Sequence, residues 1–148
     1  MSYMRAVKVH IGKTHPLFAY MSQLTSLANN LANAALFRER QVMTAVSKPE
    51  DAWTENERTV MDEVRDTQFL LASDWELPCE GKSVLFYNCL DDIMKTTGNP
   101  DYFAKGLPRQ SAQHVLKQTV RDMVSFYKAC KAFKENPSAF TGRPKLPG

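Results

Sequence analysis

Hydrophobic residues recur at three- and four-residue steps over most of the chain, which is the spacing of amphipathic helices. This pattern predicts helices over 16–46, 54–73, 83–96 and 107–134. The first helix is long for a globular protein, and its alternative is a break near Asn29 and Asn30, because asparagine is a weak helix former. At the start of the second helix, Thr54 and Glu57 have the spacing of a capping box.

The segment 3–11 alternates between apolar and polar residues instead, which predicts a half-buried β-strand. Its apolar side carries Val7, Val9 and Ile11. The backbone of such a strand needs a pairing partner, and no neighbouring segment offers one. The prediction is therefore a mainly α fold: a helical bundle of about four helices, with one N-terminal β-strand that lacks a partner.

The predicted organisation has three parts: the strand in 1–13, a helical unit in 14–136 and a Pro/Gly-rich segment in 137–148. Three prolines and two glycines in the last part predict irregular structure. Because this last part carries no packing element, we expect the chain to be truncated there.

The 148 residues, 43% hydrophobic and 24% charged, are typical of a globular domain large enough to bury a core. No apolar run approaches the ~20 residues of a membrane span, and no signal peptide is evident, so we expect a cytoplasmic protein. Cys79, Cys89 and Cys130 are odd in number and lack C-x-x-C spacing, which predicts reduced thiols.

Candidate catalytic chemistry is sparse. Asp91 and Asp92 are adjacent, so on a helix they point about 100° apart, and we expect them on a solvated surface. The histidines have no metal-ligand companions at suitable spacing, and Cys130 falls on an apolar face. No phosphate-binding glycine motif occurs. We therefore expect no enzymatic activity, no metal and no cofactor.

Charge is segregated along the chain. Residues 49–94 carry twelve acidic side chains against three basic ones, whereas residues 102–148 carry nine basic against two acidic. Residues 1–48 are also basic, with six cations and Glu39. Such asymmetry favours a polyanionic partner, although the acidic middle could instead neutralise the flanks within the fold.

The predicted helix 107–134 has an apolar stripe and a basic side. At about 100° per residue, one side gathers Lys117, Arg121, Lys128 and Lys131, with Gln113 towards the N-terminal end. Lysine and arginine suit phosphates, while arginine and glutamine also suit base edges. A solvated outer face is the alternative interpretation of such a charge run.

Three stretches together resemble the N-terminal region of the TnpB/OrfB family, transposon-encoded RNA-guided DNA nucleases related to type V CRISPR effectors and long described as transposases. The first is the segment 7–11 followed by a proline-started helix containing LANAAL at 31–36. The second is LFYN at 85–88. The third is LPRQSAQ at 107–113, leading to FY at 126–127 and GRPK at 142–145.

The resemblance covers nearly all of this chain but only the first third or so of a typical member. It implies that the opening strand belongs to a wedge-like β-barrel and that the helices form a recognition lobe, which binds guide RNA, its heteroduplex with DNA, and a transposon-adjacent DNA motif. Carried over by position, Tyr87, Arg109 and Gln113 become candidates for reading that motif. The alternative roles are a core or rim aromatic for Tyr87, a solvated charge for Arg109 and a polar boundary residue for Gln113.

The family's nuclease site, three carboxylates with a C-x-x-C zinc ribbon, does not occur in these residues. We therefore expect a nucleic-acid-binding portion that works with DNA and guide RNA, and with a downstream nuclease-domain chain if the gene is split. The competing hypothesis is a helical protein–protein interaction module or small regulator whose basic face is solvated. A helix-turn-helix repressor is a third option, but its short turn is not evident.

Overall fold

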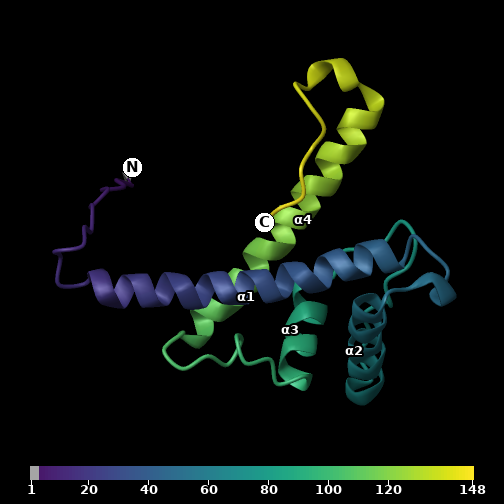
Figure 1. Cartoon of the computed structure of the whole chain (residues 1–148), viewed down its shortest axis with the longest axis horizontal. Helices are drawn as coiled ribbons and strands as arrows, with labels where there is room; N and C mark the ends of the chain where they lie inside the picture. The colour runs from purple at the N-terminus through teal and green to yellow at the C-terminus, as the bar shows by residue number, and fades with distance from the viewer. Residues whose placement is uncertain (1–3) are drawn as a thin grey trace.

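In the computed structural model, which describes residues 4–148, the chain is mainly α with four helices (Figure 1). They are α1 (Phe18–Ala45), α2 (Glu55–Leu71), α3 (Tyr87–Thr96) and α4 (Arg109–Glu135). Two short 3-10 helices, η1 (Glu50–Ala52) and η2 (Pro137–Ala139), follow α1 and α4. The prediction of four helices in this order is confirmed.

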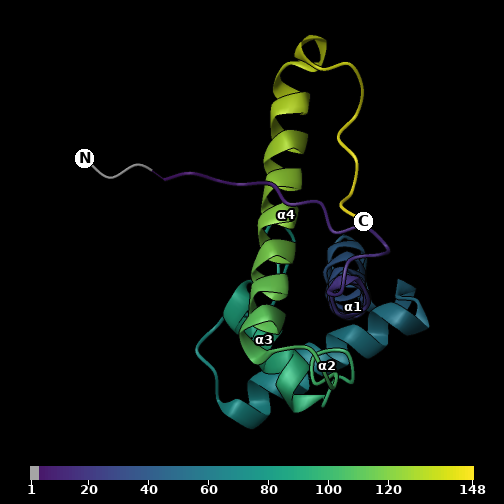
Figure 2. The same cartoon turned by 90° about the vertical axis from the view of Figure 1, so that its left-hand side faces the viewer.

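The two long helices, α1 and α4, cross each other and form the frame of the molecule (Figures 1 and 2). α2 packs on α1, and α3 packs on both α2 and α4. The core is the region where the four helices meet, and its fully enclosed side chains include Leu31, Val64, Leu90, Ile93 and Leu116. Burial of this apolar surface is the main force that holds the crossing together.

α1 runs without interruption, which confirms the single helix predicted over 16–46, and the alternative of a break near Asn29 and Asn30 is not realised. Leu31 and Ala35, just after the asparagines, are both fully buried. Their packing offsets the few tenths of a kcal/mol by which asparagine disfavours a helix.

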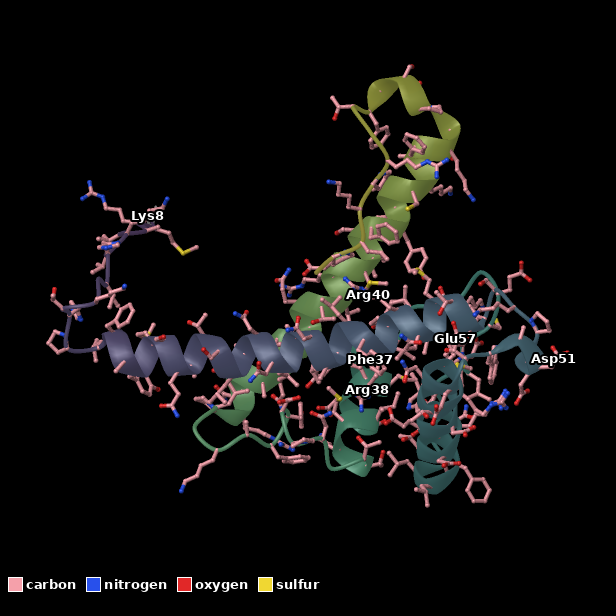
Figure 3. The ribbon with its side chains drawn as sticks, in the orientation of Figure 1. Lys8, Phe37, Arg38, Arg40, Asp51 and Glu57 are labelled. Atoms are coloured by element: carbon pink, nitrogen blue, oxygen red, sulfur yellow. The ribbon has the colours of Figure 1, made fainter. Side chains whose placement is uncertain are left out.

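The start of α2 confirms the predicted capping box. The Glu57 backbone N–H donates to Thr54 Oγ1 at 3.3 Å, and the Thr54 N–H donates to Glu57 Oε2 at 2.9 Å. Glu57 also accepts a hydrogen bond from Thr44 and pairs with Lys48 at 2.8 Å, which ties α2 to the end of α1 (Figure 3). The N-terminus of α2 is thus fixed by sequence-local and tertiary contacts together.

α3 begins at Tyr87, four residues later than predicted, because residues 83–86 are held in an extended path. The Leu85 N–H donates to the buried carboxyl group of Glu39 at 2.9 Å, and the hydroxyls of Ser83 and Tyr127 are 2.5 Å apart. These partners lie 46 and 44 residues away in sequence, so local periodicity could not indicate them.

The predicted N-terminal strand does not form in residues 4–11, and Tyr3 lies outside the described residues. Val7 and Val9 are 80% and 72% exposed, and this segment extends away from the helices (Figure 2). Within residues 4–148 the only β-pairing is an isolated bridge between Cys79 and Lys82. A segment with alternating apolar and polar residues forms a β-strand only when its backbone can hydrogen-bond to a neighbouring strand, and no such strand lies beside this segment in the described residues.

Residues 140–148 double back from the end of α4 towards α1 (Figures 1 and 2). Phe140 packs edge-on against Phe133 at 5.7 Å, and the Arg40 guanidinium donates to the Pro147 carbonyl. The predicted irregular structure is observed in this stretch, but η2 precedes it.

Candidate nucleic-acid interface

The basic side of α4 is a single continuous feature. Lys117, Arg121, Lys128 and Lys131, here called the basic row, all lie on α4 and span an arc of about 80° on the helix. Over their length the helix rises about 21 Å. Arg121, Lys128 and Lys131 are exposed, and Lys117 is half-buried. The row is therefore a surface on which several phosphates of one strand could bind.

No carboxylate of the described residues neutralises the basic row. The five ion pairs within residues 4–148 use other cations: Arg38, Lys48, Arg65, Lys82 and Lys95. Asp122 is next to Arg121 in sequence but accepts a hydrogen bond from Gln118 at 2.8 Å. Five of the twelve acidic side chains of 49–94 pair with these other cations. Among them, Glu63 accepts hydrogen bonds from Nε and one terminal nitrogen of Arg38, which lies on α1 (Figure 3).

Arg109 and Gln113 extend the row towards the N-terminal end of α4 at four-residue steps, with Arg109 exposed and Gln113 half-buried. The Arg109 guanidinium carbon lies 4.6 Å from the ring centres of both Tyr102 and Phe103. Those rings meet edge to face at 5.2 Å, so the guanidinium occupies the angle between them. This cation–π arrangement favours one orientation of the side chain, by about 0.5–1 kcal/mol for each ring at an exposed site.

Tyr87 joins the same end of the interface. It is the first residue of α3, and Lys117 Nζ lies 4.9 Å from the centre of its ring. Burial, and then the negative charge of Asp91, raise the pKa of the Tyr87 phenol. The phenol therefore stays neutral and can donate or accept a hydrogen bond. Four predicted site residues, Tyr87, Arg109, Gln113 and Lys117, are thus brought to one end of α4.

Lys128 and Lys131 lie on the later turns of α4, in the half that projects beyond the crossing with α1 (Figure 1). They share the face of Lys117 and Arg121 but not the neighbourhood of Tyr87. The predicted residues therefore form one line with two ends: an aromatic end near α3 and a purely basic end.

Asp91 lies below the aromatic end, and its predicted position on a solvated surface is wrong. It is 8% exposed, accepts a hydrogen bond from the Tyr102 hydroxyl and pairs with Lys95 Nζ at 2.5 Å. Burial and this bond raise the Tyr102 pKa far above its ordinary value. The carboxylate thereby anchors the ring that supports Arg109, and its charge is compensated by Lys95.

Sequence reasoning missed Tyr102 and Phe103. They precede α4 in a turn whose Tyr102 N–H donates to the Asn99 side chain at 3.1 Å. The only sequence signal for this turn is an Asn-Pro pair followed closely by two adjacent aromatic residues. This signal has no helical periodicity, so it does not show which residues of α4 the two rings contact.

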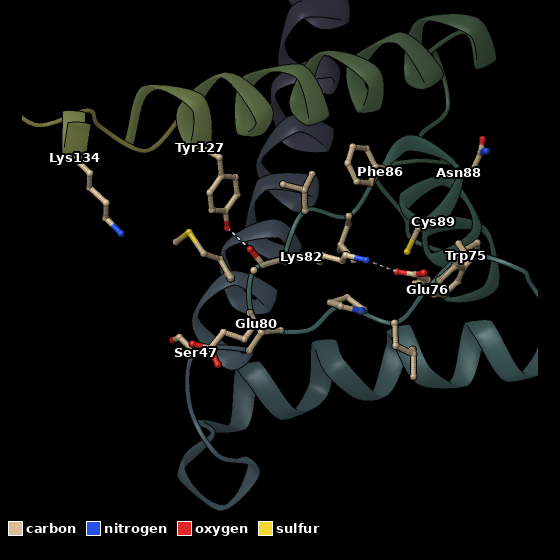
Figure 4. Close-up of a pocket in the computed structure, with 18 residues that line it drawn as sticks. Ser47, Trp75, Glu76, Glu80, Lys82, Phe86, Asn88, Cys89, Tyr127 and Lys134 are labelled. Carbon is tan, nitrogen blue, oxygen red and sulfur yellow. Dashed lines mark hydrogen bonds and ion pairs between the residues drawn. The ribbon is translucent and has the colours of Figure 1, made fainter. Parts of the chain in front are cut away.

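A separate hollow of about 990 Å³ lies between the end of α1, the segment 75–86 and the later part of α4 (Figure 4). Its lining includes Cys89, Tyr127 and Lys134, and no member of the basic row. Burial raises the pKa of the Cys89 thiol to about 12, so this sulfur stays protonated and is a poor nucleophile. The hollow therefore holds no activated cysteine.

Comparison with models of known protein families, with curated proteins and with solved structures gives no match for this chain. Residues 4–148 contain no cluster of three or more His, Cys, Asp or Glu side chains suited to a metal ion. Within the same residues, no helix combines the length and apolar character that crossing a membrane requires.

Proposed function

We propose that this chain binds nucleic acid along α4. The observation that carries the proposal is the basic row, whose four cations share one face with no ion pair to a described carboxylate. Phosphates neutralise such cations and release condensed counterions, which supplies affinity without sequence choice. The guanidinium of Arg109, the phenol of Tyr87 and the amide of Gln113 add groups suited to base edges.

The resemblance to the TnpB/OrfB family gives this binding a context. In that context the chain is the recognition portion of a transposon-encoded RNA-guided DNA endonuclease, contacting guide RNA, its heteroduplex and the transposon-adjacent DNA motif. The exposed segment containing Val7 and Val9 would pair with strands of the wedge-like barrel. Cleavage would be performed by a nuclease domain outside these residues, or by a downstream chain carrying it.

The test measures the affinity of the chain for structured RNA and duplex DNA at low salt. Lys117→Glu combined with Arg121→Glu should weaken binding by about tenfold or more, because two phosphate contacts become repulsive. The matched control, Arg58→Glu with Lys82→Glu, makes the same charge change at exposed positions outside the row. Equal losses in both variants, or no binding by the wild type, would refute the proposal.

A protein-interaction module is the second candidate, and one observation favours it. Phe69, Leu70 and Leu71, the last three residues of α2, are apolar and yet 86%, 71% and 47% exposed. Exposed apolar side chains that lie next to one another are found at interaction surfaces. If this is the main function, Phe69→Asp with Leu70→Asp should abolish self-association or partner binding measured by sedimentation, while nucleic-acid affinity is absent from the start.

A further inference from the structure

The aromatic end of the interface carries flat side chains that are not needed to bind phosphates. Phe103 is 48% exposed although its neighbour Tyr102 is 1% exposed, and the Arg109 guanidinium covers part of both rings. The exposed Phe103 ring and the exposed guanidinium are two flat groups, held together by Tyr102 and its bond to Asp91.

These groups suit the flat face of a nucleobase. Aromatic rings and guanidinium planes both stack on bases, and stacking accepts any base because every base has a π-face. In the interior of a duplex, each base is covered by neighbours on both faces. An unpaired base in a single strand or an overhang has faces free for Phe103 and Arg109, whereas a duplex leaves free only the outer face of its terminal pair.

We propose that Phe103 and Arg109 form a stacking site for an unpaired base, so that the strand bound along the basic row is single-stranded at this end. This inference rests on the proposed nucleic-acid function and specifies its ligand. From Arg109 to Lys117 the helix rises about 12 Å, which is the length of three to four stacked nucleotides of one strand. The phosphates after the stacked base thus reach Lys117 and then Arg121.

The groups around the site permit a polyanion to approach. The nearest buried carboxylate, Asp91, is compensated by Lys95 and bonded to Tyr102. Lys105, in the loop before α4, and Arg109 are both exposed, and within the described residues no side chain accepts a hydrogen bond from the Arg109 guanidinium. Its donors are therefore free for a phosphate or for a base edge while its plane is held by the two rings.

The experiment uses the 148-residue chain and fluorescently labelled DNA: a blunt duplex, the same duplex with a four-nucleotide overhang, and that overhang with abasic sites. An abasic overhang keeps the phosphates and removes the bases. The wild type should bind the normal overhang about 5- to 150-fold more tightly than the abasic one, the range expected for one stacked base.

Phe103→Ala should abolish that preference, whereas the affinity for the blunt duplex, which depends mainly on the basic row, should fall by less. Phe103→Leu, which keeps apolar packing against Tyr102, should act in the same way, so a folding defect is separated from the loss of stacking. Arg109→Lys, which keeps the charge and loses the plane, should reduce the preference. The matched control Phe69→Ala removes an exposed ring on α2 and should leave it unchanged.

Equal binding of normal and abasic overhangs by the wild type would overturn the stacking site while leaving the proposed function intact. A preference that persists in both Phe103 variants would overturn it as well. If no oligonucleotide binds at low salt, the proposed function fails first, and the stacking site fails with it.

Discussion

Replacement of Glu39 by glutamine should change how the stability of the fold depends on pH. Glu39 lies on α1 and is completely buried. One of its oxygens accepts the hydrogen bond from the Leu85 N–H, and the other has no partner. Burial raises the pKa of this carboxyl from 4.5 to about 8, although the bond from Leu85 lowers it. The folded chain therefore holds a proton on Glu39 at neutral pH.

The sign follows from proton linkage. Between pH 4.5 and about 8 the folded state binds a proton at Glu39 that the unfolded state has released, so stability falls as pH rises. Each pH unit inside this window lowers the free energy of unfolding by about 1.4 kcal/mol. From pH 5 to pH 7 the wild type should thus lose on the order of 3 kcal/mol through this one group.

Glutamine keeps an acceptor for the Leu85 N–H and does not titrate. Its extra N–H groups remain unpaired and cost about 1–3 kcal/mol, but this cost does not vary with pH. Urea unfolding followed by far-ultraviolet circular dichroism at pH 5, 6 and 7 should therefore give a much flatter profile for Glu39→Gln. Parallel profiles for the wild type and the variant would refute the reasoning, since they would mean that Glu39 is ionised in the fold.

Three further substitutions test other contacts. Thr54→Ala removes the cap of α2 and should lower the free energy of unfolding by about 0.5–2 kcal/mol in urea titrations; an unchanged midpoint would contradict the role of the cap. Contacts with Lys48 and Thr44 lower the Glu57 pKa to about 2, so the wild type should lose stability as the pH falls from 4.5 towards 2. Glu57→Gln should remove this pH-dependent loss, and an identical acid transition of both proteins in thermal melts would count against it. Tyr102→Phe leaves a buried oxygen of Asp91 without its donor and should cost about 1–3 kcal/mol, read from the unfolding midpoint against a Tyr20→Phe control at an exposed position.

The sequence was informative where structure is local. The capping spacing of Thr54 and Glu57 placed the start of α2 within one residue, and the periodicity of 107–134 placed α4 and its basic side. Both depend only on neighbours within a few turns. α1 was predicted as one helix over 16–46, and it does not break at Asn29 and Asn30 because tertiary packing of Leu31 and Ala35 outweighs their weak helix propensity.

Features that depend on distant residues could not be predicted in this way. The late start of α3 reflects the bond from Leu85 to Glu39, and the aromatic support of Arg109 reflects the burial of Asp91 beneath Tyr102. The N-terminal alternation was a real pattern, but a strand requires a partner that the described residues do not provide. The basic half of the candidate site was therefore predictable from sequence, whereas its aromatic half was not.

The most direct test of binding along the basic row is the salt dependence of affinity for a blunt DNA duplex. If Lys117, Arg121, Lys128 and Lys131 each contact a phosphate, the logarithm of the binding constant should fall against the logarithm of salt concentration with a slope of about −3.6. Lys117→Gln with Arg121→Gln should reduce that slope to about −1.8. A slope near zero for the wild type, or the same slope in the variant, would contradict the account.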